Sequence, residues 1–433
     1  MPPATIRLSE SATRTPEQPI SYFMQQALEN PGLISLAAGL VDEMSLPTAE
    51  VATTLAELMA MPQHARSALQ YGTTQGYLPL RTKLCDRFAT ADGTTPEQLN
   101  ISPEDVIVTN GSQQLLYLLS EVLLDPGDIV ITEAPSYFVY HGTLASRGAR
   151  VLAIPMDDRG MRIDALEEQL ERLDSSGELN RLKLIYTVDY FQNPSGLSLS
   201  LERRKQLMEL VRRYSRNHRI LILEDAAYRE LRFDGDDVPS IKRFDSRNEH
   251  VIYTTTFSKP LTPGLKTGYG VMPRELVAPI LRLKGNHDFG SANLAQHLID
   301  RLLSNGMYDR HVADLRMVYR SKSVAMLDAL QAEFREWPEV RWTRPSGGMY
   351  VWLKFPAHVR TGMGSPFLHA AMHEGVLYIP GEFCHVTCEG EPLPTCECRL
   401  CFGVATPVQI REAVHRLARA AKPLLQPCQT AAV

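Results

Sequence analysis

The chain has 433 residues, of which 44% are hydrophobic and 22% are charged, as in folded globular proteins and unlike disordered ones. Its 45 basic and 50 acidic residues give a net charge of -5, which offers no electrostatic basis for binding nucleic acid or an anionic membrane. Length alone favours about two to three domains, and small-molecule chemistry is the default expectation.

The start of the chain lacks the apolar core of a signal peptide, and no stretch reaches the roughly 18 apolar residues of a membrane span. These features predict a cytoplasmic protein. Seven cysteines, an odd number, fit reduced thiols better than a disulfide framework. Five of them lie between Cys384 and Cys401. No metal site is predicted there, because Cys398 and Cys401 would point to opposite faces of one strand.

Between residues 70 and 300, short apolar runs alternate with helical patterns. The predicted strands are residues 105–109, 128–134, 149–155, 182–188, 219–226 and 250–257. Helical patterns such as 113–124 and 201–217 stand between several of them. This alternation predicts an α/β fold with a mainly parallel sheet that carries helices on both faces and binds ligands at the carboxyl ends of its strands.

The remaining sequence reads as a second, smaller unit. It contains a long helical pattern over residues 291–334, a strand pair or edge within 342–356, a strand at 398–403 and a terminal helix from residue 407. We expect residues 1–45 to pack on this unit. The predicted domains are therefore 46–305 for the large domain and 306–433 for the small one.

Polar residues follow the predicted strands and form a set. The first strand is followed by Gly111, Ser112 and Gln113 at a helix N-terminus, and the others by Tyr137, Asn193, Asp225 with Tyr228, and Ser258 with Lys259. Each has an ordinary alternative: a helix cap, a turn, a core aromatic or a solvated lysine. Together, phosphate donors, an aromatic ring, an amide, a carboxylate and a lysine suit a phosphorylated heteroaromatic aldehyde.

Nine motifs occur in order over about residues 20–420: ISLAAGL, YGTTQGYLPLR, TNGSQQ, EAPSY, QNPSG, LEDAAYRELRF, TFSKPLTPGLKTGY, PSGGMYVWL and CRLCFG. In them the chain resembles the pyridoxal phosphate-dependent aminotransferases of fold type I, class I/II, and within these the kynurenine/2-aminoadipate aminotransferase branch. The resemblance implies a seven-stranded, mainly parallel sheet sandwiched by helices, a smaller α+β domain, and pyridoxal 5'-phosphate as the cofactor.

The resemblance also implies roles for the residues at the strand ends. Lys259 would hold the cofactor aldehyde as a Schiff base and then move a proton at the substrate Cα. Asp225 would pair with the ring nitrogen and keep it protonated, which makes the ring an electron sink. Asn193 and Tyr228 match contacts to the phenolic oxygen of the cofactor, and Tyr137 matches the ring that stacks on it.

Further contacts follow from the same resemblance. Those to the phosphate match Gly111, Ser112, Gln113 and Ser258. Lys266 stands where the family has a phosphate-binding arginine, so it keeps the charge but loses the bidentate fork. Tyr71 matches a tyrosine that reaches the phosphate of the neighbouring subunit, which implies a homodimer with shared active sites. Arg399, with Gly39 and Asn193, matches the site for the substrate α-carboxylate.

The implied reaction moves an amino group from an α-amino acid to a 2-oxo acid such as 2-oxoglutarate. Two alternatives remain: another reaction of the cofactor, such as β-elimination, decarboxylation or cyclisation, and a non-catalytic effector module. The second is disfavoured because few residues precede the predicted sheet and the chain is acidic. Two residues depart from the family pattern. Lys266 replaces an arginine, and Val41 stands where many relatives have proline. The donor stays open, with Tyr22 or Phe23 as candidates for its side-chain pocket.

Overall fold

The computed structural model describes residues 6–386 and 392–426. Its large sheet has the strand order β2-β9-β8-β7-β6-β3-β4-β5. The strands are β2 (Val106–Thr109), β3 (Ile129–Ala134), β4 (Arg150–Asp157), β5 (Gly160–Met161), β6 (Leu182–Thr187), β7 (Leu221–Asp225), β8 (Val251–Thr256) and β9 (Gly268–Val271). All six strands predicted from apolar runs are present.

The large sheet is mostly parallel, as predicted. Strands β4, β3, β6, β7 and β8 run parallel to one another in that order. Strand β9 is antiparallel to both β2 and β8, and the two-residue β5 is antiparallel to β4. The expected seven strands are thus joined by one short edge strand. The apolar pattern did not mark β9, because two of its four residues are glycine.

Helices cover both faces of the large sheet, and the strands are therefore buried on both sides. Val130, Leu184 and Leu223 belong to the core that includes apolar residues of α5 (Leu78–Ala91), α6 (Gly111–Leu123) and α7 (Phe138–Arg147). Their chain neighbours Ile131, Ile185 and Ile222 pack with α8 (Ile163–Ser175) and α9 (Leu201–Tyr214). This alternation sends successive side chains to opposite layers.

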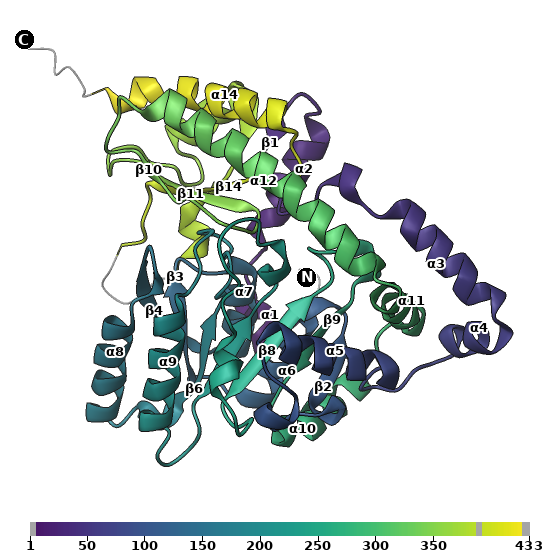
Figure 1. The fold of residues 1–433 in the computed structure, drawn as a ribbon. Helices are drawn as coiled ribbons and strands as arrows, with labels where there is room; N and C mark the ends of the chain where they lie inside the picture. Colours follow the sequence, from purple (N-terminus) through teal and green to yellow (C-terminus); the bar gives the residue numbers. More distant parts are fainter. Residues whose placement is uncertain (1–5, 387–391, 427–433) are drawn as a thin grey trace, which may run out of the picture.

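A smaller antiparallel sheet has the order β10-β11-β14-β13. Its strands are β10 (Arg341–Trp342), β11 (Tyr350–Lys354), β13 (Ile379–Pro380) and β14 (Glu397–Cys401). Helices α12 (Met307–Phe334) and α14 (Pro407–Leu425) pack together above it (Figure 1), with α13 (Pro366–His373) against α14. The predicted strand pair, the strand at 398–403 and the terminal helix are therefore confirmed.

The helical pattern over residues 291–334 forms two helices. Helix α11 (Asn293–Ser304) ends before Gly306, whose φ of 71° is in the left-handed region, and α12 begins at the next residue. Glycine adopts this conformation without the steric cost that a Cβ brings. The pattern of apolar residues continues across the break, which explains why the sequence suggested a single helix.

The N-terminal segment contacts both sheet regions. Helix α1 (Glu10–Arg14) packs on α7, α2 (Pro19–Glu29) follows, and β1 (Ile34–Ser35) pairs in parallel with β12 (Val376–Leu377). Helices α3 (Thr48–Ala60) and α4 (Pro62–Leu69) then extend along one side of the molecule (Figure 1), and α10 (Arg274–His287) precedes α11. None of the helices in the described ranges is both long and apolar enough to cross a bilayer. The domain boundaries given above stay predictions.

Candidate active site

The residues predicted at the strand ends gather where the large sheet meets the small one. Asp225 is the last residue of β7, Lys259 follows β8 by three residues, and Asn193 lies in the loop after β6. Arg399, from the middle of β14, reaches across and donates a hydrogen bond to Asn193. The carboxyl ends of parallel strands thus open onto the small sheet, where a ligand is expected in this class of fold.

The amine of Lys259 lies inside this site. Its Nζ donates a hydrogen bond of 2.7 Å to the carbonyl oxygen of Gly39. Burial, and the positive charges of Arg399 and Lys266, lower the pKa of Lys259 to about 8, while the Cys401 thiol acts in the opposite direction. A larger fraction of this amine is therefore uncharged near neutral pH than in an exposed lysine, as a nucleophile requires.

Asp225 is 4% exposed and accepts a hydrogen bond of 3.1 Å from the Tyr186 hydroxyl. Burial raises the pKa of Asp225 to about 6, although the hydrogen bonds from Tyr186 and from the N–H of Ala227 oppose the shift. A buried carboxylate is stabilised by a cationic partner. Among the described residues, no cationic side chain forms a hydrogen bond or an ion pair with Asp225. The site therefore suits a ligand with a protonated nitrogen.

Arg399 is 2% exposed and is held by two hydrogen bonds. Its Nη1 donates to Asn193 Oδ1 at 2.8 Å and its Nη2 donates to the carbonyl oxygen of Ala37 at 2.6 Å. Its guanidinium lies over the Tyr350 ring, 4.6 Å from the centroid. The Nε atom is buried and has no hydrogen-bond partner in the described part of the chain. Since no carboxylate neutralises this guanidinium in that part of the chain, it suits an anionic substrate group.

The start of helix α6 offers an anion site. Its N-cap, Asn110, makes no side-chain capping bond within the described residues, so the N–H groups of Gly111 and Ser112 stand at an open helix N-terminus. Strand β9 passes close by: a Cβ on Gly268 would lie 2.6 Å from the Ser112 nitrogen. Only glycine permits this approach. Ser258 is in the same region, because its hydroxyl accepts a hydrogen bond of 2.9 Å from Thr256, the register partner of Gly268.

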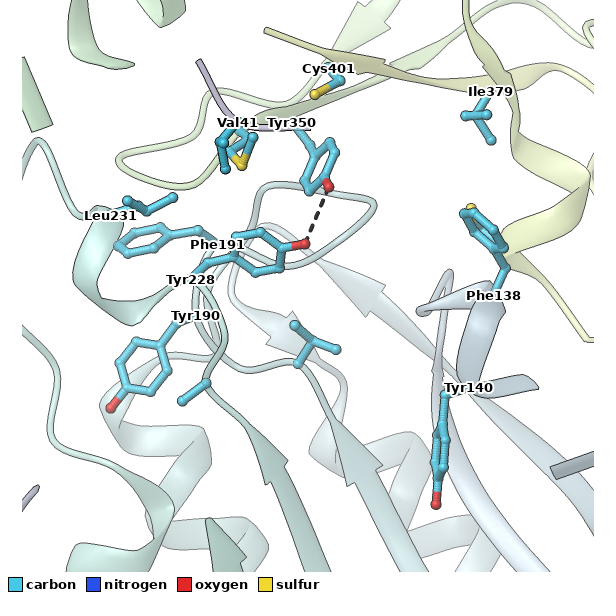
Figure 2. Packing of buried hydrophobic residues seen from close by; sticks show 14 of the residues in the cluster. Val41, Phe138, Tyr140, Tyr190, Phe191, Tyr228, Leu231, Tyr350, Ile379 and Cys401 are labelled. Carbon is cyan, nitrogen blue, oxygen red and sulfur yellow. Dashed lines mark hydrogen bonds between the residues drawn. The ribbon is translucent and has the colours of Figure 1, made fainter. Parts of the chain in front are cut away.

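Two tyrosine hydroxyls meet between the two sheets. The hydroxyls of Tyr228 and Tyr350 are 3.2 Å apart, and Figure 2 shows Tyr228 approaching from the large-sheet side and Tyr350 from the small sheet. Burial raises the pKa of Tyr228 well above its ordinary value and that of Tyr350 to about 12. Both hydroxyls therefore stay protonated at neutral pH and can donate a hydrogen bond to a ligand oxygen.

The structure adds residues that sequence reasoning did not single out. Tyr350 lies in the quoted PSGGMYVWL motif, which was the available signal, whereas Tyr186 lies inside a strand and has no local signal. Tyr137 is the N-cap residue of α7. Its pKa is raised, first by burial and then by the negative charge of the nearby Asp225. Gln113 has a buried Oε1 without a hydrogen-bond partner in the described residues.

Some candidates lie away from this cluster. Tyr71 is 82% exposed, and its ring packs edge to face on Phe289 with centroids 5.5 Å apart. Of the two N-terminal candidates, Phe23 is 1% exposed and packs in the core, whereas Tyr22 is 40% exposed, and a role of either in the side-chain pocket stays a prediction. Cys388 lies outside the described residues. Within them, no group of three or more His, Cys, Asp or Glu side chains is arranged to hold a metal ion.

The residues that are present fit pyridoxal phosphate. An open helix N-terminus beside a glycine suits the phosphate, the buried Asp225 suits a protonated ring nitrogen, and the pKa of Lys259 suits an amine that reacts with an aldehyde.

Comparisons with known proteins agree with this fit. Residues 31–417 match the family described as aminotransferase class I and II. The chain is 35% identical over 398 residues to aromatic-amino-acid aminotransferase 1 of Thermococcus litoralis, covering 91% of this chain and 89% of that one. It is also 35% identical over 402 residues to the 2-aminoadipate transaminase of Thermus thermophilus, covering 92% of each.

A solved structure of similar fold is the kynurenine aminotransferase of Pyrococcus horikoshii in complex with PMP, with KYN as substrate and KYA as product. The identity is 32%, the TM-score is 0.87, and the match covers 97% of this chain and 98% of that one. A second is LysN, the α-aminoadipate aminotransferase of Thermus thermophilus, complexed with a phosphopyridoxyl derivative of leucine, at 33% identity and a TM-score of 0.82 over 96% of this chain and 98% of that one.

Proposed function

The chain belongs to the aminotransferase class I and II family, and from this membership we propose that it moves the amino group of an aromatic α-amino acid to 2-oxoglutarate. It is a pyridoxal phosphate-dependent aminotransferase that acts on amino acids and 2-oxo acids. The observation that carries the proposal is the buried Arg399, whose Nε has no partner among the described residues. Both amino acids and 2-oxo acids carry the carboxylate that such a guanidinium binds.

Pyridoxal phosphate, when bound, supplies a carbonyl group that takes up amino groups and a ring that accepts electrons from the substrate Cα. Lys259 is the amine that holds the cofactor and then moves the proton at Cα. Its depressed pKa supports both tasks. Asp225 keeps the ring nitrogen protonated, and its burial supports this role because a buried carboxylate is stabilised by a cation.

The remaining side chains bind and orient. Arg399 would bind the substrate carboxylate. Asn193 accepts a hydrogen bond from the Arg399 guanidinium and, with Tyr228, would help to hold the cofactor at its phenolic oxygen. The phosphate contacts are the first turn of α6, with Gly111, Ser112 and Gln113, and the side chains of Ser258 and Lys266. Lys266 is supported by its positive charge, which contributes to lowering the pKa of Lys259.

The aromatic donor is supported by the names of two relatives, an aromatic-amino-acid aminotransferase and a kynurenine aminotransferase.

We further propose a homodimer in which Tyr71 completes the phosphate site of the partner subunit. Its support is the 82% exposure of this large aromatic side chain, whose ring packs on Phe289. Gel filtration with light scattering measures the assembly.

The test of the function uses the Lys259→Ala variant and a panel of donors. The wild type should form an absorption band of covalently held cofactor and release a 2-oxo acid from phenylalanine, tyrosine or kynurenine. Lys259→Ala should fold, lack that band and be inactive. Normal turnover by Lys259→Ala would contradict the role of Lys259, and faster release from 2-aminoadipate or leucine would contradict the aromatic donor.

A further inference from the structure

Residues 36–42, which we call the 36–42 segment, pass through the site without forming a helix or a strand. Two carbonyl groups of this segment contact site residues. That of Ala37 accepts a hydrogen bond of 2.6 Å from Arg399, and that of Gly39 accepts one of 2.7 Å from Lys259. The guanidinium proposed to bind the substrate carboxylate and the amine proposed to hold the cofactor therefore share one stretch of backbone.

The 36–42 segment is held at both of its ends. At the first end, the Leu36 N–H donates a hydrogen bond of 2.8 Å to the carbonyl oxygen of Leu377 in β12, and the Leu36 carbonyl accepts one of 2.8 Å from the N–H of Cys401 in β14. At the other end, the Asp42 N–H donates a bond of 3.2 Å to the hydroxyl of Tyr319 in α12. Because the residues between belong to no helix or strand, the position of the two carbonyl groups depends on these end contacts.

A buried lysine of α12 completes the second end. Lys322 and Asp42 are 3% and 7% exposed, and the Lys322 Nζ donates a hydrogen bond of 2.6 Å to Asp42 Oδ1. The same Nζ donates to the carbonyl oxygens of Gly403 and Val404, at 2.7 and 3.1 Å. These two residues follow β14, the strand of Arg399. One ammonium group thus joins the 36–42 segment to the loop after that strand, and removing either partner of such a buried ion pair leaves an uncompensated charge.

A buried lysine can also be structural only, and the chain offers such a case for comparison. Lys242 is fully buried, and its Nζ donates hydrogen bonds of 2.7 Å to Asn248 Oδ1 and to the carbonyl oxygen of Val251. Val251 is the first residue of β8, whereas Lys259 lies beyond the last residue of that strand. Lys242 therefore makes contacts of the same kind as Lys322, at the end of the strand that points away from the site.

We propose that Lys322 and Asp42 are positioning residues for substrate binding. They hold the 36–42 segment in the place where the Ala37 carbonyl orients the Arg399 guanidinium. Amino acids and 2-oxo acids both carry the carboxylate that Arg399 is proposed to bind, so loosening the segment weakens the binding of both. The inference rests on the proposed carboxylate site, but not on the identity of the donor or the acceptor.

The contact of Lys322 with the segment is tested by amide hydrogen exchange of the holoenzyme, followed by mass analysis of a peptide that covers residues 36–45. Lys322→Met keeps an unbranched apolar side chain but removes the ammonium group, and Lys242→Met is the matched control. We expect exchange in this peptide to be about tenfold faster or more in Lys322→Met than in the wild type, which corresponds to the loss of a hydrogen bond to a charged group. Equal exchange in Lys322→Met and Lys242→Met overturns the proposal.

The positioning role is tested by steady-state kinetics with the donor and acceptor that the wild type uses best. Lys322→Met should raise KM for the amino acid and for the 2-oxo acid by about 10- to 100-fold, because misplacing a binding group by about 1 Å costs up to about 100-fold. The change in kcat should be smaller, since contacts to the carboxylate exist both before and during the reaction. Lys242→Met should lower stability and leave both KM values unchanged. Wild-type KM values in folded Lys322→Met overturn the proposal.

Two substitutions of Asp42 give the same decision if Lys322→Met does not fold. Asp42→Asn keeps the oxygen that accepts from Lys322 and should keep KM near that of the wild type, whereas Asp42→Leu, of nearly the same size, should raise it. Equal KM values in these two variants overturn the proposal. If the wild type used no aromatic donor, the proposed donor would be wrong, but the exchange measurement and the KM for the donor that it does use would still decide the role of Lys322.

Discussion

Arg399 and Asn193, 206 residues apart in the chain, are joined by a hydrogen bond of 2.8 Å from Nη1 to Oδ1. The bond links β14 of the small sheet to the loop after β6 of the large sheet. The group proposed to bind the substrate carboxylate is therefore oriented by a group proposed to bind the cofactor. A shift of one sheet against the other would misplace both.

Arg399→Lys tests the carboxylate site. Lysine keeps the charge, but its compact ammonium lacks the planar fork by which Arg399 bonds to Asn193 and Ala37 and can present parallel donors to a carboxylate. We expect kcat/KM for an amino acid to fall about 10- to 150-fold, corresponding to the roughly 1.5–3 kcal/mol of a hydrogen bond to a charged group. Steady-state kinetics measures the loss. A primary amine of the same side chain, without the carboxylate, is the control and should show no comparable change.

Asp225→Ala tests the buried carboxylate. Without it the cofactor ring nitrogen has no anionic partner, and we expect kcat to fall at least about 100-fold, the usual effect of removing one preorganised electrostatic group. The variant should retain some cofactor, because the phosphate and Lys259 contacts remain. Absorption spectra and single-turnover rates separate the two effects. Activity within a few fold of the wild type would show that Asp225 is a structural residue only.

Gly39→Ala tests a close approach in the site. A Cβ on Gly39 would lie 2.4 Å from the Tyr350 hydroxyl oxygen, but 3.5 Å from the next ring atom. We expect Gly39→Ala to destabilise the apoprotein by about 1–3 kcal/mol, and Tyr350→Phe to restore most of that loss in the double variant. Urea unfolding measures each step of this cycle.

Gly32→Ala is the matched control for this cycle, because a Cβ there meets no atom within 4 Å. It should be close to neutral in both backgrounds. If Gly39→Ala were equally costly with and without the Tyr350 hydroxyl, the clash would have another origin.

The pH dependence of Lys259 follows from its pKa of about 8. The folded pKa is below the value of about 10.4 of a free lysine, so the amine loses its proton in the folded apoprotein before it does in the unfolded chain. Between these values the unfolded state binds more protons, and the stability of the apoprotein should rise with pH. Reductive methylation of Lys259, followed by peptide mass analysis, should be half-maximal near pH 8. A midpoint near pH 10 would contradict the shift.

Most of the large sheet could be predicted from the chain itself. Runs such as residues 182–188 and 219–226 are apolar without alternation, which is typical of strands buried on both faces, and they formed β6 and β7. Strand β9 was not predicted from hydropathy because Gly268 and Gly270 make no apolar run, and their need for close packing on α6 is visible only in space. The break before Gly306 was missed for the opposite reason, since the apolar period runs through it.

The site was partly predictable for a physical reason. Gly111, Asp225 and Lys259 each stand at or just after the end of a strand, and parallel topology brings such positions to one edge. The amino-acid sequence by itself thus determined the fold class and the chemistry at the strand ends. Only the tertiary structure decided the partners that come from elsewhere, such as Tyr186 on Asp225, Tyr350 on Tyr228 and Ala37 on Arg399. Hydrophobic periodicity reports which residues are buried, but contacts between distant segments depend on how the sheets dock.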